Sequence, residues 1–101
     1  MEIKAFKALA HPIRRQIMVA LRSGAKPSGE LAELFDASWP TISRHLMTLK
    51  QAELITAERK ATSILYRANT SVLEDAAAAV MALIGNDDGD DLDNETKEAA
   101  E

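Results

Sequence analysis

The segment from residue 37 to residue 51, ASWPTISRHLMTLKQ, constrains the fold most, because one of its faces is apolar and must be buried while the other is polar. Ile42, Leu46 and Leu49 recur at i, i+4 and i+7, which predicts one apolar stripe along a helix. The opposite side, counted at about 100° per residue, is almost free of aliphatic side chains. It presents Pro40, Thr41, Ser43, Arg44, Met47, Thr48 and Gln51. One cation among small hydrogen-bonding groups therefore forms a polar face that core packing does not explain.

Sequence signals delimit this helix and the helix before it. Ser38 is a natural N-cap, and Pro40 falls in the first turn, where a missing N–H costs nothing. Upstream, Ser28 is expected to cap a shorter helix. The apolar face of that helix would consist of Leu31, Leu34 and Phe35. A short helix, a tight connection over residues 36–38 and a longer capped helix are typical of a helix-turn-helix.

Helical periodicity also predicts two helices before this motif, from residue 3 to about residue 10 and onward from Pro12. After residue 51 the period changes to alternation, so residues 54–59 and 63–68 predict a β-hairpin with a connection at 60–62. A last helix follows, with Ser71 and Glu74 in capping-box spacing. The predicted fold class is mainly α with a small β-hairpin (α+β), in the order four helices, two strands and one helix.

The two terminal helices carry more apolar surface than one chain of this size can bury. The first helix is strongly apolar for its length, and the last has apolar or small residues on more than one face. Surplus apolar surface at both ends predicts a homodimer with two-fold symmetry. The expected contact residues are Ile3, Phe6, Val72, Ala76, Val80 and Leu83.

The formal net charge of −4 averages two unlike regions. Residues 85–101 hold eight acidic side chains and one lysine, which gives a net charge of −7. Residues 1–84 hold the remaining 11 basic and 8 acidic side chains, which gives a net charge of +3. We therefore expect a folded, mildly basic domain over residues 1–84 and an acidic, disordered tail over residues 85–101. The overall acidity does not argue against a nucleic-acid partner. Solubilisation is the favoured role of the tail, and competition with DNA is the alternative.

Other features narrow the class of protein. The absence of cysteine rules out disulfides and thiolate metal sites. The sequence also shows no signal peptide and no apolar run long enough to cross a bilayer. Together these features predict a cytoplasmic protein without a membrane partner. Two histidines without a nearby carboxylate pair make a poor metal site, so no metal or cofactor is expected. An enzyme is disfavoured because the chain offers no nucleophile with a base and no glycine-rich phosphate loop.

Four stretches, LAHPIRRQIMVAL, SGELAELF, ISRHLMTLKQAELI and RKATSILYR, together resemble the ArsR family of winged-helix transcriptional repressors. The similarity covers roughly residues 3–84, and the ending LYRANTSVLEDA is similar to the SdpR-like autorepressor branch. The resemblance implies a winged helix-turn-helix, a dimer and binding to operator DNA. It also implies that the helix of residues 39–51 enters the major groove and that the hairpin is a wing along the DNA backbone.

The expected DNA-binding residues come from the polar face, the resemblance and the hairpin tip. The resemblance places recognition at Trp39, Pro40, Ser43 and Arg44, with His45 just behind. The face calculation adds Thr41 and Thr48, and the hairpin tip adds the adjacent cations Arg59 and Lys60. Arginine can donate two hydrogen bonds to guanine O6 and N7, so Arg44 is the favoured base-reading residue.

The sequence departs from the family pattern in two places. Ala61 stands at the wing tip where the family usually has glycine. The family's metal sensors carry cysteines on the third helix or a His/Asp set on the last, whereas here the third helix reads ELAELFD and the last has neither histidine nor cysteine. The metal-sensing chemistry is therefore not expected, and the sequence identifies no effector.

Several roles stay open at this level. Trp39 could contact DNA or be buried against the neighbouring helix, and His11 is expected to cap or pack between the first two helices. A helix is expected to start near Arg14 and Arg15, where positive charge is unfavourable, so we expect both arginines to have a partner. An acidic side chain is the first choice and a DNA phosphate is the second. The alternative function is a winged-helix protein-interaction module that has lost DNA binding.

Overall fold

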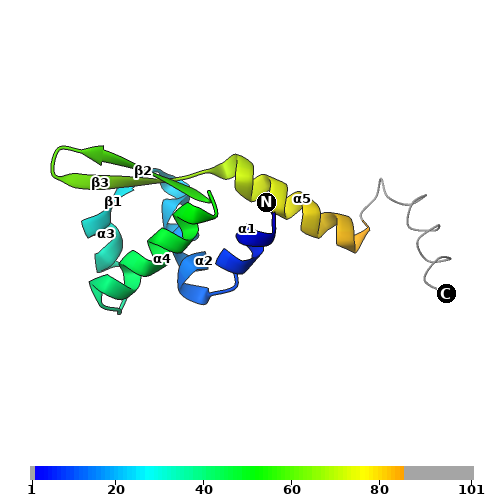
Figure 1. The fold of residues 1–101 in the computed structure, drawn as a ribbon, viewed down its shortest axis with the longest axis horizontal. Coiled ribbons are helices and arrows are strands. Elements are labelled where there is room, and N and C mark those ends of the chain that lie inside the picture. Colours follow the sequence, from blue (N-terminus) through cyan, green and yellow to red (C-terminus); the bar gives the residue numbers. More distant parts are fainter. Residues whose placement is uncertain (1, 86–101) are drawn as a thin grey trace.

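The computed structural model describes residues 2–85, which form helices packed around one end of a small antiparallel sheet (Figure 1). The α+β fold class and the predicted order of helices, hairpin and last helix are confirmed. The elements are α1 (Glu2–Ala8), α2 (Pro12–Ala20), the 3-10 turn η1 (Leu21–Ser23), β1 (Lys26–Pro27), α3 (Ser28–Glu33), α4 (Trp39–Gln51), β2 (Ile55–Lys60), β3 (Ser63–Ala68) and α5 (Thr70–Ile84).

The apolar stripe of α4 lies at the centre of the core, as its spacing predicts. Ile42, Leu46 and Leu49 are buried completely or almost completely. Around them pack the large buried side chains Ile17, Leu21, Leu31, Leu54 and Ile55. No polar or charged side chain of residues 3–85 is buried with them. The core is thus purely apolar, and it fixes the rotation of α4 about its own axis.

The sheet contains a strand that the sequence did not predict. Lys26 and Pro27, directly before the predicted third helix, pair with Tyr66 and Leu65 of β3, so the strand order is β1-β3-β2. Pro27 is tolerated because an edge strand does not need every N–H. The N-cap of α3 is consequently Pro27 and not Ser28, so that prediction was wrong by one residue. This pairing ties the hairpin to the start of the helix-turn-helix.

Helix α3 is shorter than its apolar pattern predicts. It ends at Glu33 with Leu34 as its C-cap, and Leu34 is exposed instead of lying on a buried face. Phe35 beyond the helix packs partly against the core. A longer connection, residues 34–38, therefore leads into α4.

The hairpin turns through Ala61 and Thr62, since Lys60 still pairs with Ser63. Ala61 has φ 54°, the left-handed region that glycine adopts without strain, which accounts for glycine as the family's usual choice there. Arg59 and Lys60 are consecutive in a strand, so they point to opposite faces of the hairpin. Both cations expected at the hairpin tip thus lie at the end of β2, one on each face.

A tight junction joins α4, β2 and α5. Glu53, with φ 64°, ends α4 in a Schellman arrangement, in which the Leu54 N–H donates to the Leu49 carbonyl and the Glu53 N–H to the Lys50 carbonyl. Asn69 then holds this turn, because its Nδ2 donates to the Glu53 carbonyl over 3.0 Å. Asn69 is also the N-cap of α5, so the predicted capping box at Ser71 and Glu74 was wrong.

Helix α5 runs away from the rest of the domain (Figure 1). Its first half packs against α1 and the core through Val72, Leu73 and the buried Ala76. Its second half projects beyond the body and ends at Gly85. The acidic tail was expected over residues 85–101; Gly85 is the C-cap of α5, and residues 86–101 lie outside the described residues. Among residues 2–85, no helix is long and apolar enough to cross a membrane.

Candidate nucleic-acid interface

The N-terminal end of α4 offers unsatisfied backbone N–H groups at the surface. Ser38 is the N-cap, as predicted, but its hydroxyl lies 3.1 Å from Thr41 Oγ1 and caps no backbone N–H. Free N–H groups and the helix dipole attract anions at such an end. The hydroxyls of Ser38 and Thr41 lie at the same end and can donate to the same ligand.

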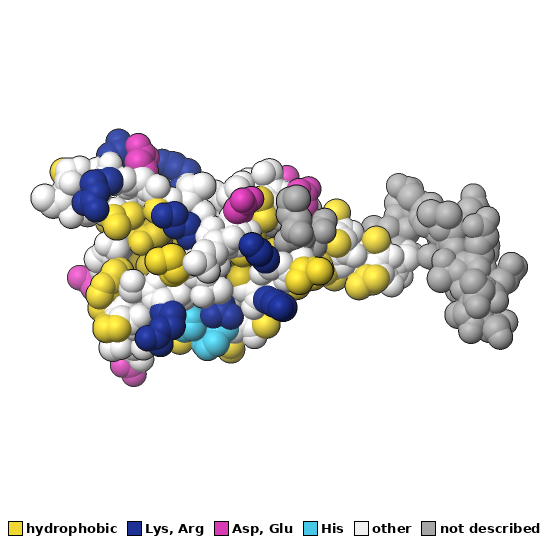
Figure 2. Space-filling model, in the orientation of Figure 1, with side chains coloured by type: hydrophobic (Ala, Val, Ile, Leu, Met, Phe, Trp, Pro, Cys, Tyr) yellow, Lys and Arg dark blue, Asp and Glu magenta, His cyan; other side chains and the backbone are white. Residues whose placement is uncertain are grey.

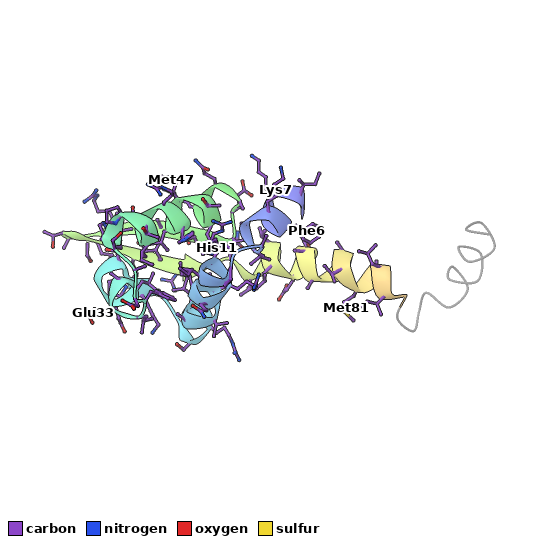
Figure 3. All side chains as sticks on the ribbon, turned by 90° about the horizontal axis from the view of Figure 1, so that it is seen from below. Phe6, Lys7, His11, Glu33, Met47 and Met81 are labelled. Carbon is purple, nitrogen blue, oxygen red and sulfur yellow. The ribbon has the colours of Figure 1, made fainter. Side chains whose placement is uncertain are left out.

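The side chains expected to contact DNA lie on the accessible side of α4. Trp39, Pro40 and Arg44 are exposed, and Thr41 and Ser43 are partly exposed. Trp39 keeps 44% of its surface accessible, so it is not fully buried and part of the indole is available for contact with DNA. Met47 also points outward from α4 (Figure 3). The structure therefore brings the predicted residues of α4 onto one continuous face.

Within residues 2–85, no ion pair or hydrogen bond holds the Arg44 guanidinium. All five of its N–H donors are available to a ligand, whereas its backbone carbonyl accepts a bond from Thr48 Oγ1 over 3.1 Å. Thr48 would have to give up that bond in order to donate to DNA. The geometry thus favours Arg44 over Thr48 as a donor.

Two histidines that are far apart in the sequence meet behind this face. The rings of His11 and His45 are 4.4 Å apart between centroids and tilted by 49°. His11 Nδ1 accepts from the Ile13 N–H over 3.1 Å and caps α2, which confirms its predicted capping role. His45 Nδ1 lies 3.2 Å from Arg14 Nη1, and because a guanidinium can only donate, His45 accepts there and carries its proton on Nε2.

The two arginines at the start of α2 are partnered by backbone carbonyls and not by the acidic side chain expected from sequence. Arg14 Nε donates to the Ala8 carbonyl over 2.6 Å and Nη2 to the Lys7 carbonyl over 3.3 Å, while Arg15 Nη1 donates to the Leu9 carbonyl over 2.7 Å. These carbonyls end α1, where the dipole favours positive charge. The arginines therefore fasten α1 to α2.

The surroundings of His45 disfavour its protonation. Burial lowers the pKa of His45 below its ordinary value of 6.5, and the neighbouring His11, Arg14 and Arg44 lower it further because they oppose an additional positive charge. His45 is consequently neutral at pH 7 and can keep accepting the bond from Arg14.

The wing contributes cations on both of its faces. Arg59 shares a face with its partner Ile64, and Lys60 shares the other face with Ser63, Glu58 and Arg67. Arg67 is exposed and was not selected from the sequence, although strand alternation and the hairpin register identify its face. Because Glu58 lies between Lys60 and Arg67 on that face, its carboxylate offsets part of their charge.

Figure 2 shows one face of the molecule, on which lysine and arginine side chains lie on both sides of the histidine pair and acidic side chains lie toward the edges. In the part of the chain that the structure describes, no three histidine, aspartate or glutamate side chains come together to hold a metal ion. The surface is thus suited to an anionic partner.

Comparison with known proteins gives the family. The model of the bacterial regulatory protein ArsR family matches residues 11–57. The transcriptional repressor SdpR of Bacillus subtilis is 44% identical over 85 residues, covering 84% of this chain and 94% of that protein. The chain belongs to the ArsR family. It is a DNA-binding transcriptional repressor of the ArsR type and not an enzyme.

Solved structures agree with this ArsR assignment. The crystal structure of a possible transcriptional regulator for arsenical resistance matches with a TM-score of 0.71 and 30% identity, covering 88% of this chain and 92% of that chain. An ArsR-like transcriptional regulator from Rhodococcus sp. RHA1 matches with a TM-score of 0.77 and 24% identity, over 99% of this chain and 92% of that one. At that identity the second match supports the fold alone.

The position of His45 predicts how stability depends on pH. The pKa of His45 is lower in the folded chain than in the unfolded chain, where it is about 6.5. As the pH falls below about 6.5, the unfolded chain therefore takes up a proton on His45 before the folded chain does. The free energy of unfolding decreases over this range, until the pH reaches the folded-state pKa. Urea unfolding at about pH 7.5 and about pH 5.5 should show this loss, and His45→Gln, which keeps an acceptor for Arg14, should reduce it. An equal loss in both proteins would contradict this account of His45.

Proposed function

We propose that this repressor acts as a homodimer on an imperfect palindrome, with α4 of each protomer in the major groove. The observation that carries the proposal is the exposed guanidinium of Arg44, which has no ion-pair or hydrogen-bond partner among residues 2–85. It lies on a polar face, little more than one turn from a helix N-terminus that attracts phosphate. An α helix fits the major groove of B-DNA, and recognition helices contact base edges with their N-terminal residues.

Each expected residue then has a definite role. Arg44, with Ser43 and Pro40, reads base edges, and the exposed indole of Trp39 packs on a sugar or a thymine methyl. Thr41 and the α4 N-terminus bind the backbone. Behind them, His45 and Thr48 hold the helix and its neighbours in place. The wing adds phosphate contacts through Arg59 and Lys60, one from each face of the hairpin.

The proposed dimer rests on apolar surface that one chain leaves uncovered. Ile3 is 67% exposed and Leu83 is 86% exposed, and the second half of α5 projects with further apolar side chains. A groove of about 410 Å³ between α1 and α5 is lined by Phe6, Leu9, Leu73, Ala76, Ala77, Val80 and Met81. Figure 3 labels Phe6 on α1 and Met81 in the second half of α5. Apolar surface of this extent is typical of a protein interface.

Not all expected interface residues are equally accessible. Ala76 is only 3% exposed and lies among the residues that line the groove, whereas Val72 packs partly against the core and does not line it. Ile3, Phe6, Val80 and Leu83 remain for contact with the second protomer. Two-fold symmetry through these helices would place the recognition helices in half-sites roughly 34 Å apart. We further propose the repressor's own promoter as a target, on the similarity to SdpR.

The role of Arg44 is tested by operator binding. We expect Arg44→Ala to weaken binding to the chain's own promoter fragment by about 1–3 kcal/mol per half-site, because each protomer loses a bidentate contact to guanine. Arg22→Ala, which removes an exposed arginine of η1, is the matched control and should bind as the wild type does. Gel-shift titrations against a scrambled duplex measure both. Equal affinity of Arg44→Ala and wild type would reverse the assignment.

The dimer interface is tested by a charge placed in the groove. Val80→Glu should weaken dimerisation at least about 10-fold, because it buries a carboxylate without a partner. Val19→Glu is the control, since Val19 is a similarly exposed valine on α2, outside the terminal helices. Sedimentation velocity over a concentration series reports the oligomeric state. A wild-type monomer, or a Val80→Glu dimer as tight as the wild type, would refute this interface.

A further inference from the structure

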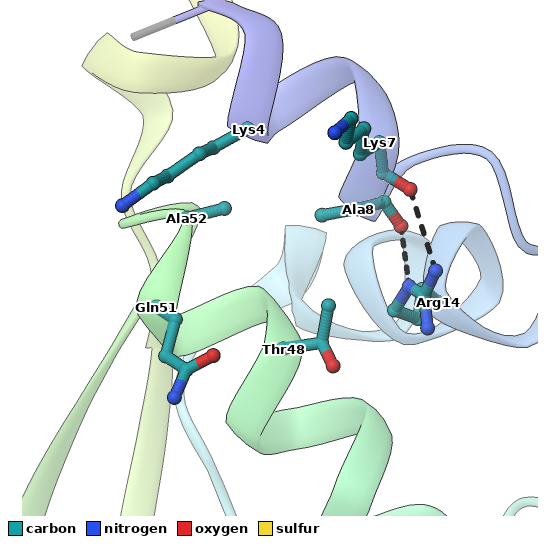
Figure 4. Close-up of a pocket in the computed structure, with 7 residues that line it drawn as sticks. All are labelled: Lys4, Lys7, Ala8, Arg14, Thr48, Gln51 and Ala52. Atoms are coloured by element: carbon teal, nitrogen blue, oxygen red, sulfur yellow. Dashed lines mark hydrogen bonds between the residues drawn. The ribbon is translucent and has the colours of Figure 1, made fainter.

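A second cationic surface lies beside α4 and is not part of the expected DNA-binding set. A pocket of about 510 Å³ opens between α1, the start of α2 and the C-terminal half of α4 (Figure 4). It is lined by Lys4, Lys7, Ala8, Arg14, Thr48, Gln51 and Ala52. Three of these seven residues are cationic and none is acidic, so the pocket is positively charged. An adjoining pocket shares Lys4, Gln51 and Ala52 and brings one carboxylate, Glu53, to the outer edge.

Arg14 forms a fixed wall of this pocket. Its guanidinium donates to the Ala8 and Lys7 carbonyls and to His45, which holds the planar group in one orientation. Among residues 2–85, by contrast, Lys4 and Lys7 form no ion pair and their ammonium groups make no hydrogen bond. The two lysines are thus the groups available to a ligand, and Arg14 adds a fixed positive charge behind them.

The lysines occupy a face of α1 that dimerisation would leave open. At about 100° per residue, Lys4 and Lys7 point about 100° away from the exposed pair Ile3 and Phe6. They point about as far from the small residues Ala5 and Ala8, which pack into the core. Helix α1 therefore presents separate surfaces to the core, to a second protomer and to the pocket.

The pocket continues the polar face of α4. Thr48 and Gln51 belong to both. Arg44 lies near His45, which contacts Arg14, and Arg14 in turn contacts the backbone of Lys7, so the cations of the two surfaces are close neighbours. Figure 2 shows this face as dark blue groups around the histidines. In Figures 1 and 3, α1 lies on the side of α4 opposite the hairpin tip. With α4 in a groove, the wing and this pocket would lie on opposite flanks.

We propose that this pocket binds backbone phosphates of the operator, on the flank of α4 away from the wing, with Lys4 and Lys7 as the ligating groups. The inference rests on the proposed function and deepens it. A free phosphate ester has the same chemistry, but the residues shared with the DNA-facing side of α4 favour a phosphodiester of the bound duplex. In the dimer, this flank lies toward the centre of the palindrome.

The test compares two doubly substituted proteins of equal net charge. Lys4→Gln/Lys7→Gln removes the pocket's lysines, and Arg22→Gln/Lys26→Gln removes two cations outside it. Operator affinity is measured by fluorescence anisotropy from about 50 to about 300 mM salt. Each phosphate contact contributes about 0.9 to the steepness of log K against log salt. We therefore expect this dependence to become less steep by about 2–4 for a dimer of the pocket variant, and to stay unchanged for the control variant. Preference for operator over scrambled duplex should stay unchanged, since phosphates carry no sequence.

A second readout uses the DNA. Neutral methylphosphonates at the central phosphates of the operator should weaken wild-type binding at least about 10-fold, and should cost the pocket variant much less. Equal losses in both proteins, or an unchanged salt slope in the pocket variant, would overturn the proposal and leave the proposed function standing. Failure of the wild type to bind the operator at any salt would overturn both.

A third arm separates DNA from a free ligand. About 10 mM inorganic phosphate, added at constant ionic strength, should leave operator affinity unchanged in all three proteins. If it changes the affinity of the wild type but not of the pocket variant, the pocket takes a free anion, and the assignment to DNA is wrong. Because Lys4 and Lys7 are exposed, thermal unfolding of the pocket variant should match that of the wild type.

Discussion

Burial of one apolar stripe determines which side of α4 faces outward. Ile42, Leu46 and Leu49 contribute almost no surface to solvent, and rotating α4 by one residue would expose them at a cost of about 1.5–3 kcal/mol each. The stripe therefore holds α4 at one angle about its axis. At that angle Arg44 and the residues beside it point outward. The proposed DNA-binding surface thus depends on packing inside the core.

The elements around α4 are held by contacts that also keep this surface positively charged. Arg14 ties α1 to α2 through carbonyl groups, so no acidic side chain is needed to balance it, and its charge remains directed at the surface. His45 accepts from Arg14, stays neutral and adds no repulsion between Arg14 and Arg44. The same face can therefore carry several cations and still fold. Among residues 2–85, no acidic side chain pairs with Arg14 or Arg44, which leaves both charges available to an anion.

Much of this arrangement could be predicted from sequence, because local rules govern it. Periodicity identified α4 and its buried stripe, and alternation identified the hairpin. The remainder depends on contacts between distant residues. The strand Lys26–Pro27 exists only because β3 pairs with it, and the His11–His45 contact joins residues 34 apart in sequence. The carbonyl partners of Arg14 and the early end of α3 likewise follow from tertiary packing, which local propensity does not encode.

The position of Trp39 allows the central claim to be measured directly. It is the only tryptophan of the chain, and it lies 44% exposed at the start of α4, where the groove would enclose it. Its fluorescence in the presence of acrylamide should report that enclosure. Saturating operator duplex should protect Trp39 from the quencher, whereas a scrambled duplex should protect it less. If the operator binds, as shown by anisotropy of labelled DNA, and quenching of Trp39 is unchanged, then α4 does not enter the groove by this end.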